Sequence, residues 1–361
     1  MRIRELSLRP FRNFASIHLH IEANHTLIFG PNGRGKSNIL EAISYLSIGK
    51  SVRGAKDHQA VPHDGDYFDI RANCEEGRHE QRIRIFYGKK EGKKAFLDDN
   101  PLARVSDILG HFRTVHFSPE DVSLVLRFPA QRRRILDILI SQYSATYLRD
   151  LQLYQRVLNQ RNHLLRTAKR SSNGVMSDET ISPWDAQLAE LGARIRSMRL
   201  TALEILGKPF VQYYARFSPG GEEASIDYKG IRDQGTDLEA ALLEELERKR
   251  PQELQAGHTL CGPHRDDVSF VLNGQSAEIY ASEGQLKTIL IAWKLAEGRY
   301  LEQCCGQQPV ILLDDVFSEL DHDRIGVLLE IVDEFEQVVV TTPQKPEARL
   351  VGCFEQIRLE K

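Results

Sequence analysis

The feature that most constrains this chain is a glycine-rich loop at residues 30–37, with the sequence GPNGRGKS. A short apolar run, residues 26–29, precedes the loop, and a helix-compatible segment, residues 38–46, follows it. This order of strand, loop and helix is that of a phosphate-binding P-loop, and G-x-x-x-x-G-K-S is fully matched. Glycines let backbone N–H groups approach phosphate oxygens closely, and the new helix directs its positive end at the same oxygens. The sequence therefore predicts a nucleoside triphosphate site rather than an ordinary turn.

Within the loop, Lys36 is expected to reach the β- and γ-phosphates, and the Ser37 hydroxyl to bind Mg²⁺. We expect the cofactors to be ATP and Mg²⁺. The residues expected to bind ATP in this chain are Gly30, Pro31, Asn32, Gly33, Arg34, Gly35, Lys36, Ser37 and Asn38.

An apolar run that ends in two acids, VILLDD at residues 310–315, is the second part of the predicted site. An aspartate at the end of such a strand can hold Mg²⁺ beside the P-loop serine, so Asp314 and Ser37 are the expected metal ligands. Asp315 stands where a hydrolytic ATPase places the carboxylate that orients attacking water. The predicted catalytic residues are therefore Lys36, Asp314 and Asp315.

Composition limits the class of protein. The chain has 361 residues, of which 41% are hydrophobic and 27% charged, as in an ordinary globular protein. No apolar run approaches the roughly 20 residues of a membrane helix, and no signal peptide begins the sequence. The five cysteines show no disulfide or metal spacing, so a cytoplasmic location is expected. Because the net charge is −3, any nucleic-acid surface must be local.

Hydrophobic periodicity predicts an α/β fold with an inserted helical part. Alternation predicts three strands before the loop, at residues 1–29, and further short strands at 68–74, 82–87, 94–98 and 113–117. Heptad-like spacing predicts a helix within 129–168 and another from Trp184 to Pro209, which form either a short helical hairpin with arms of about 35 Å or a plain helical bundle. A hairpin is predicted within 267–280, helices at 283–303 and 321–335, and strands at 310–314 and 337–341. The expected domains are residues 1–121, 122–257 and 258–361.

Ser282-Glu283-Gly284-Gln285 opens a predicted helix ahead of the strand at residues 310–314. It resembles the signature motif of ABC-type ATPases, usually L-S-G-G-Q, and departs from it at Ala281 and Glu283. The resemblance implies that this motif contacts the γ-phosphate held by a second subunit. A simple helix N-cap is the alternative, because the same residues satisfy that pattern too.

Ser318 to Asp321 matches the D-loop of the same family. The residues implied to bind ATP in trans are Ser282, Gly284, Gln285 and Asp321. Thr341-Thr342 stands where the family usually has a switch histidine, and Ser118 to Asp121 is the best positional match to the glutamine loop. We therefore expect slow turnover that suits a switch.

Four further segments indicate which family of ABC-type ATPases the chain resembles. They are LRPFRNF at 8–14, FSPED at 117–121 followed by PAQRRR at 129–134, GPHRDD at 262–267 and SEGQLK at 282–287. Together they resemble the RecF family of bacterial recombination mediators over nearly the whole chain. The resemblance implies an ABC-type ATPase head with an N-terminal mixed β subdomain and an inserted helical domain. It implies a weak, DNA-dependent ATPase that acts in DNA replication, repair and the SOS response. Such proteins bind duplex DNA and single-strand gap junctions, form ATP-dependent homodimers, and load recombinase with RecR and RecO, with hydrolysis driving release.

Local basic clusters are the candidate DNA contacts, above all Arg132, Arg133 and Arg134. Their alternative is a solvated helix face. Two other candidates suggest metal binding. His264-Arg265-Asp266-Asp267 is better explained as a structural Arg–Asp network. His18 and His20 share a strand face, and a solvated face is favoured because no carboxylate or cysteine lies nearby in the sequence.

Two other classes of function remain at this point. One is an ATP-gated protein-interaction module with only minor DNA contact. The other is a small-molecule kinase, which is disfavoured because a kinase has no use for the motifs at residues 282–285 and 318–321.

Overall fold

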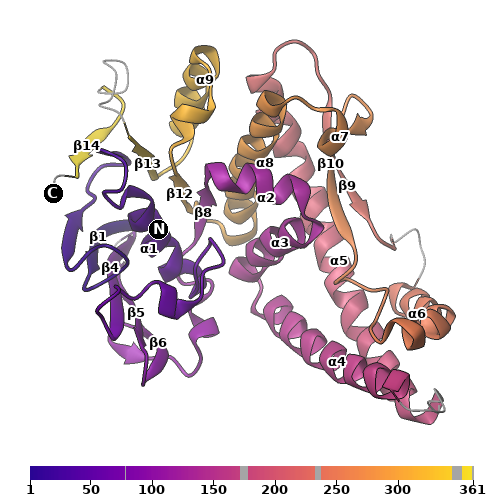
Figure 1. Cartoon of the computed structure of the whole chain (residues 1–361). Helices are drawn as coiled ribbons and strands as arrows, with labels where there is room; N and C mark the ends of the chain where they lie inside the picture. Colours follow the sequence, from indigo (N-terminus) through magenta and orange to yellow (C-terminus); the bar gives the residue numbers. More distant parts are fainter. Residues whose placement is uncertain (78, 171–177, 232–236, 344–351, 360–361) are drawn as a thin grey trace. The chain divides into compact units, whose positions relative to one another are not determined.

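A five-stranded parallel sheet carries the P-loop (Figure 1). Its strand order is β14-β3-β13-β12-β8, and each neighbouring pair is parallel. Strands β8, β12 and β13 are buried along their whole length, as expected where helices cover both faces of a parallel sheet. The strands are β3 (His25–Phe29), β8 (Thr114–Phe117), β12 (Val310–Leu313), β13 (Val338–Thr342) and β14 (Glu355–Arg358).

The helices beside this sheet follow the elements that the sequence predicts. Helix α1 (Lys36–Ile48) begins at the P-loop, and α8 (Glu283–Cys305) lies against β8. Helix α9 (His322–Val332) lies between β12 and β13 in the chain. The shorter helical segments are α2 (Pro119–Arg127) and the 3₁₀ turns η1 (Asp57–Gln59), η2 (Val105–Ile108) and η3 (Val316–Glu319).

A six-stranded antiparallel sheet is formed mainly from the N-terminal part of the chain. Its order is β2-β1-β4-β5-β6-β7, and Leu6, Leu8, Leu19 and Ile70 face a core shared with α1. The predicted strands in this region are confirmed. They are β1 (Arg2–Leu8), β2 (Ile17–His20), β4 (Tyr67–Glu76), β5 (His79–Gly88) and β6 (Gly92–Leu97). The two-residue strand β7 (Asn100–Pro101) was not predicted.

The computed structural model describes residues 1–77, 79–170, 178–231, 237–343 and 352–359. The chain divides into two compact units. Unit 1 holds residues 1–124, 209–223 and 281–361, and unit 2 holds 125–208 and 224–280. Compared with the expected domains, residues 209–223 join the ATPase part and residues 258–280 join the helical part. Among the described residues, no helix is both long and apolar enough to cross a membrane.

Unit 2 is a group of helices with a small antiparallel sheet of order β11-β10-β9. Its heptad positions Tyr147, Tyr154, Leu158 and Leu165 are buried, as the spacing predicts. The elements are α3 (Pro129–Tyr143), α4 (Ala145–Arg170), α5 (Asp178–Phe217), α6 (Leu238–Ala256), α7 (Ala277–Tyr280), β9 (Ala224–Lys229), β10 (Asp267–Leu272) and β11 (Gln275–Ser276). The end of α5, from residue 209 onward, belongs to unit 1.

One expectation for this region was wrong: helix α5 does not end at Pro209 but continues to Phe217, where Phe210 and Tyr214 bury their rings and outweigh the hydrogen bond that the proline removes. Helix α6 was not predicted. The predicted hairpin is confirmed, although its second strand has only two residues and is followed by α7. The polar connection before α5 lies partly at residues 171–177, outside the described residues.

One buried arginine joins three helices of unit 2. Arg161 of α4 donates through Nε to Asp185 Oδ1 of α5 at 2.5 Å, and its Nη2 lies 2.7 Å from Glu253 Oε2 of α6. Its Nη1 donates to Thr259 Oγ1 at 2.8 Å. The Arg161, Asp185 and Glu253 side chains are at most 1% exposed. Because α4 and α5 pack with α3 and α6, the hairpin that the heptads suggest is part of a bundle.

Replacing Arg161 with Ala is expected to destabilise unit 2 by about 3–5 kcal/mol, because removing one partner leaves buried carboxylates uncompensated. The chain has two tryptophans, Trp184 in unit 2 and Trp293 in unit 1. Urea unfolding followed by Trp184 fluorescence in a Trp293→Phe background therefore reports on unit 2. Arg194→Ala is the control, because that side chain is 50% exposed, and its effect should stay within about 0.5 kcal/mol. Equal unfolding midpoints for the two variants would contradict the structural role of Arg161.

Candidate nucleotide-binding site

The P-loop backbone has the shape that a phosphate cradle needs. Gly30, Gly33 and Gly35 all have positive φ angles, of 153°, 81° and 94°. A Cβ on Gly35 would lie 2.5 Å from Asn13 Oδ1 and 2.6 Å from Phe14 Cζ, so only glycine fits there. Gly35 is also the N-cap of α1 and provides no side-chain cap. The first turn of α1 therefore keeps backbone donors for an anion.

The Lys36 ammonium group is held inside this loop. Its Nζ donates to Gly30 O at 2.7 Å and to Pro31 O at 3.0 Å, and the residue is only 7% exposed. Burial lowers the pKa of Lys36, while the nearby charges of Asp315 and Asp314 act in the opposite direction. A triphosphate can replace the two carbonyl partners with charged oxygens, which bind an ammonium group more strongly.

The structure joins Ser37 and Asp314, which lie 277 residues apart. Ser37 Oγ donates to Asp314 Oδ1 at 2.9 Å, and Asp314 is 5% exposed. A hydroxyl and a carboxylate oxygen are ligand types that Mg²⁺ prefers beside a nucleotide, so this pair fits the expected metal ion. The predicted proximity of P-loop and acidic strand end is present in the described chain.

Thr341 supports the same carboxylate. Its Oγ1 donates to Asp314 Oδ1 at 2.6 Å and accepts the Asp315 N–H at 3.0 Å. The position that a switch histidine usually occupies thus holds a hydroxyl that orients the acidic pair. Asp315 itself has a left-handed backbone, with φ 45°, and accepts a 2.6 Å hydrogen bond from Ser318 Oγ. Burial raises the pKa of Asp315, although the Ser318 hydrogen bond opposes this.

Three charged residues that the sequence did not single out lie behind the site. Glu41 of α1 is fully buried and accepts hydrogen bonds from Arg12 Nη2 at 2.6 Å and Arg12 Nε at 3.0 Å. Arg53 Nη2 lies 3.4 Å from Asp314 Oδ2. An available signal was the acid at position 41, four residues after Ser37 on an otherwise apolar helix. These contacts hold α1, and with it the P-loop, against the neighbouring segments.

The two segments expected to act in trans are both exposed helix starts. Ser282 caps α8 in a reciprocal box: its Oγ accepts the Gln285 N–H at 3.3 Å, and Gln285 Oε1 accepts the Ser282 N–H at 2.7 Å. Asp321 caps α9 by accepting the Arg324 N–H at 2.9 Å. Among the described residues, no hydrogen bond of Ser282, Gln285 or Asp321 reaches residues 30–38. The N-cap interpretation is thus correct for the isolated chain.

These two helix starts lie next to each other. A Cβ on Gly284 would lie 3.3 Å from Arg324 Nη1, and Lys287 Nζ lies 2.8 Å from Glu319 Oε2. The signature-like and D-loop-like segments therefore form one surface, called here the α8–α9 surface. In Figure 1 the start of α8 is drawn well apart from α1.

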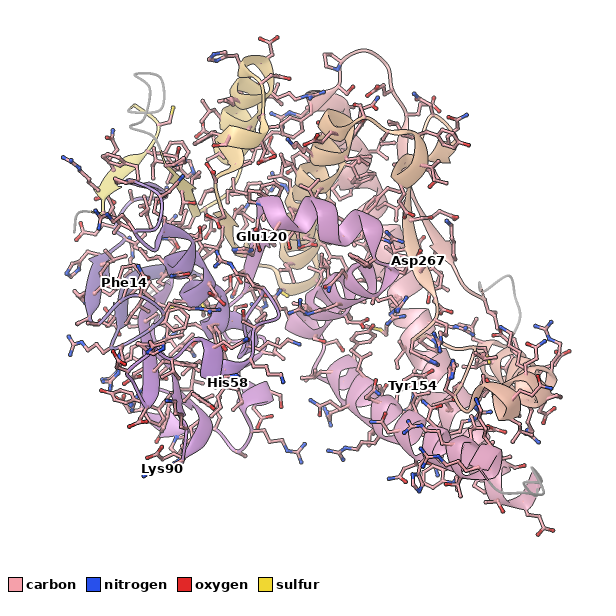
Figure 2. All side chains as sticks on the ribbon, in the orientation of Figure 1. Phe14, His58, Lys90, Glu120, Tyr154 and Asp267 are labelled. Atoms are coloured by element: carbon pink, nitrogen blue, oxygen red, sulfur yellow. The ribbon has the colours of Figure 1, made fainter. Side chains whose placement is uncertain are left out.

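Most of the arginines expected to contact DNA are engaged inside unit 2. Arg132 is 3% exposed and donates to both oxygens of Asp267, at 2.9 and 2.7 Å (Asp267 is labelled in Figure 2). Arg133 donates to Asp266 O at 2.6 Å, and burial lowers the pKa of its guanidinium. The expectation of a basic DNA patch at Arg132 is therefore corrected, since its charge is neutralised internally. Arg134 is partly buried.

Asp266 lies at the centre of a buried hydrogen-bond network with an arginine, as the sequence predicts. Asp266 accepts hydrogen bonds from Arg196 Nε and Nη2, both at 2.8 Å, and from Tyr228 at 2.5 Å. His264 Nδ1 contacts the Tyr154 hydroxyl at 2.8 Å, and burial lowers its pKa to about 4. This network binds helices of unit 2 to the β9–β10 pair.

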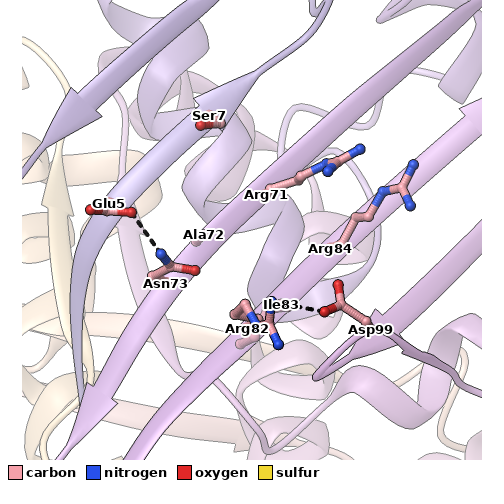
Figure 3. A pocket seen from close by; sticks show the side chains of 9 residues that line it. All are labelled: Glu5, Ser7, Arg71, Ala72, Asn73, Arg82, Ile83, Arg84 and Asp99. Carbon is pink, nitrogen blue, oxygen red and sulfur yellow. Dashed lines mark hydrogen bonds and ion pairs between the residues drawn. The ribbon is translucent and has the colours of Figure 1, made fainter.

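A separate hollow of about 210 Å³ lies on the outer face of the six-stranded sheet (Figure 3). Arg71 and Arg84 both donate to the nearly buried Asp69, so the two guanidinium groups share one carboxylate. No part of the P-loop lines this hollow. Its lining residues are Glu5, Ser7, Arg71, Ala72, Asn73, Arg82, Ile83, Arg84 and Asp99.

Comparison with known proteins gives a consistent result. The family model described as "RecF/RecN/SMC N terminal domain" matches residues 2–357. A "DNA replication and repair protein RecF" from Moorella thermoacetica is 38% identical over 95% of this chain and 90% of its own length. The protein of the same description from Salinibacter ruber is 36% identical, over 96% of this chain and 85% of its own length.

Solved structures agree. A structure of "the recombination mediator protein RecF-ATPrS in RecFOR pathway" matches with a TM-score of 0.88 and 33% identity, covering 99% of this chain and 95% of that one. An Smc head domain with an extended coiled coil from Pyrococcus furiosus matches with a TM-score of 0.57 and 16% identity, covering 99% of this chain and 93% of that one. The second match shows a shared fold.

Replacing Gly35 with Ala is expected to weaken ATP binding by at least about tenfold, because the left-handed backbone alone costs about 1–2 kcal/mol for a residue with a side chain, before the clash with Asn13 is added. Equilibrium binding of a fluorescent ATP analogue measures the loss. Gly326→Ala in α9 is the matched control, since a Cβ there meets nothing within 4 Å. Similar affinities for the two variants would show that Gly35 does not shape the cradle.

Proposed function

The chain belongs to the RecF family of DNA replication and repair proteins, and from this premise we propose that it is an ATP-dependent DNA-binding protein of recombinational repair. The observation that carries the ATP part is the pairing of Ser37 with Asp314 beside Lys36. In this proposal the P-loop residues hold the triphosphate, and Ser37 and Asp314 hold Mg²⁺, which neutralises phosphate charge. Lys36 contributes charge at the β- and γ-phosphates.

The second part of the proposal is an ATP-dependent homodimer. The α8–α9 surface offers the exposed N-termini of two helices, whose donors and dipoles suit a phosphate. Ser282, Gly284, Gln285 and Asp321 of one copy are proposed to contact the ATP held by the other copy. To do so, the Ser282 hydroxyl exchanges its cap hydrogen bond for one to a phosphate oxygen. Each chain then supplies half of two identical sites.

Hydrolysis is proposed to undo the dimer slowly. Asp315, held by Ser318 and by the left-handed turn, accepts a hydrogen bond from the attacking water and orients it. Thr341 fixes the positions of both acids, because its hydroxyl donates to the Asp314 carboxylate and accepts the Asp315 N–H. Loss of the γ-phosphate removes the contact between subunits, which makes the enzyme a weak ATPase used as a dimerisation switch.

The proposed partners are duplex DNA, single-strand gap junctions, RecR and RecO, with recombinase loading as the outcome and the cytoplasm as the location. The pathway named for the matching RecF structure supports this assignment. DNA contact is assigned to the dimer rather than to Arg132, because that residue is paired within unit 2.

The burial of several arginines favours an alternative function. Arg132, which the sequence suggested for DNA contact, is 3% exposed and paired with a carboxylate of its own chain, and the same holds for the buried Arg196 and Arg199 of α5. This supports an ATP-gated protein-interaction module with only minor DNA contact. The two proposals differ in whether DNA changes dimerisation or turnover.

Replacing Ser282 with Arg is expected to weaken ATP-dependent dimerisation by roughly 100-fold while ATP binding stays unchanged, because overpacking a closed contact costs about 1–3 kcal/mol. Sedimentation velocity with ATP and Mg²⁺ measures the dimer, and the fluorescent analogue measures binding. Ser225→Arg, on an exposed position of β9, is the control. ATP-driven dimers of normal affinity in the Ser282 variant would refute the contact in trans.

Replacing Asp315 with Asn is expected to leave ATP binding and dimerisation intact while turnover falls at least tenfold. In the unmodified protein the ionised Asp315 polarises the attacking water, whereas a neutral carboxyl or amide oxygen accepts its hydrogen bond more weakly and is a poorer base. Because burial raises its pKa, activity should begin to fall, as pH decreases, at a higher pH than for an ordinary aspartate. Phosphate release across pH measures this, with unfolding followed in parallel. An unchanged rate in Asp315→Asn would remove the residue from the mechanism.

The DNA part is tested by adding gapped duplex DNA to these assays. The repair proposal expects DNA to stimulate turnover several-fold and to stabilise the dimer. If DNA changes neither quantity, the interaction-module alternative is the correct one.

A further inference from the structure

Two histidines and a glutamate meet on the outer face of the six-stranded sheet. His18 and His20 lie two residues apart on β2, so they share one face while Leu19 between them is buried. The antiparallel register of β1 and β2 places Glu5 opposite His20, and Ser7 opposite His18. The neighbouring strand therefore supplies a carboxylate on the same face as the two histidines.

The three side chains converge closely. One ligand atom from each of Glu5, His18 and His20 lies within 4.8 Å of the others. Glu5 Oε1 lies 3.5 Å from His20 Nδ1. Two ligands of a tetrahedral zinc ion lie about 3.4 Å apart, given bond lengths of about 2.1 Å. The closest pair already has this separation, and the His20 side chain, 58% exposed, has room to rotate.

Neighbouring polar groups orient two of the three side chains. Ser7 Oγ lies 2.6 Å from His18 Nδ1, which leaves Nε2 of that ring for a ligand. Asn73 Nδ2 donates to Glu5 Oε2 at 2.6 Å, which leaves Oε1 directed at His20 (Glu5 and Asn73 are drawn in Figure 3). Hydrogen bonds of this kind commonly fix ring orientation and ligand basicity in metal sites.

We propose that Glu5, His18 and His20 form a solvent-open binding site for a divalent transition metal ion, with Zn²⁺ as the fitting ion. Imidazole and carboxylate ligands suit zinc, and a set of three protein ligands leaves a position for water or an anion. Glu5 and Ser7 also line the hollow in Figure 3, where Arg71 and Arg84 lie. The metal ion is thus placed at the edge of this hollow. This site is independent of the nucleotide site and of the proposed function.

Zinc titration of the full chain, expressed without a histidine tag, tests the proposal. A Cys353→Ser background removes the one exposed thiol among the described cysteines. We expect one Zn²⁺ per chain, measured by competition with a chromophoric zinc indicator. The double variant His18→Ala/His20→Ala should lose this binding, and Glu5→Gln, which keeps the partner Asn73, should weaken it at least tenfold. Co²⁺ bound at the site should show no thiolate charge-transfer band.

His63→Ala is the matched control, because His63 is a fully exposed histidine beside the carboxylate of Asp64. It should bind zinc as the background protein does. Zinc should also raise the melting temperature of the background protein and of the control, but not that of the double variant. ATP binding, measured alongside, should be the same in all variants. Zinc binding of unchanged stoichiometry and affinity in the double variant, or a thiolate band with Co²⁺, would overturn the proposal.

Discussion

One carboxylate connects the parts of unit 1 that the nucleotide chemistry needs. Asp314 accepts hydrogen bonds from Ser37 and Thr341 and lies beside Arg53, so four distant segments meet at a side chain that is 5% exposed. A buried carboxylate is costly unless it is paired and hydrogen-bonded. Its neighbours therefore stabilise the fold and define the metal position at the same time. Any ion at this place replaces contacts that already hold the P-loop to the strand β12.

In unit 2 the buried charges are arginines that pair with carboxylates. Its arginines are long side chains buried against acids of other elements: Arg161 joins α4 to α5 and α6, and Arg196 joins α5 to Asp266. Buried pairs of this kind gain little net stability over apolar packing, but each partner depends strongly on the other. An arginine-rich helix sequence is thus ambiguous. The same residues suit DNA phosphates or internal carboxylates, and only the fold decides between them.

The sequence predicted the parts of the site whose chemistry is local. The loop at residues 30–37 and the strand end at Asp314 were found because spacing alone specifies them, and the helix start at Ser282 was recognised as a cap as well as a motif. Glu41 and Arg53 were not found, and Thr341 was noted only for its place in the chain, since the roles of all three come from contacts between distant segments. The continuation of α5 past Pro209 was missed because tertiary burial outweighed the local signal. Helix α6 has clear local signals of its own, an Asp237 N-cap and a Gly257 C-cap, which could have predicted it.

Strand register explains why the sequence did not predict that Glu5 lies beside His18 and His20. His18 and His20 carry a periodicity that any reader of the sequence can see, yet it does not state which residue faces them. The pairing of Glu5 with His20 depends on the turn between β1 and β2. A shift by one residue would bring Leu6 or Arg4 to that position and exclude a metal ion. Ser37 and Asp314 are the contrasting case: the sequence motifs predicted this pair without any knowledge of register, and the fold joins the two side chains by a hydrogen bond of 2.9 Å.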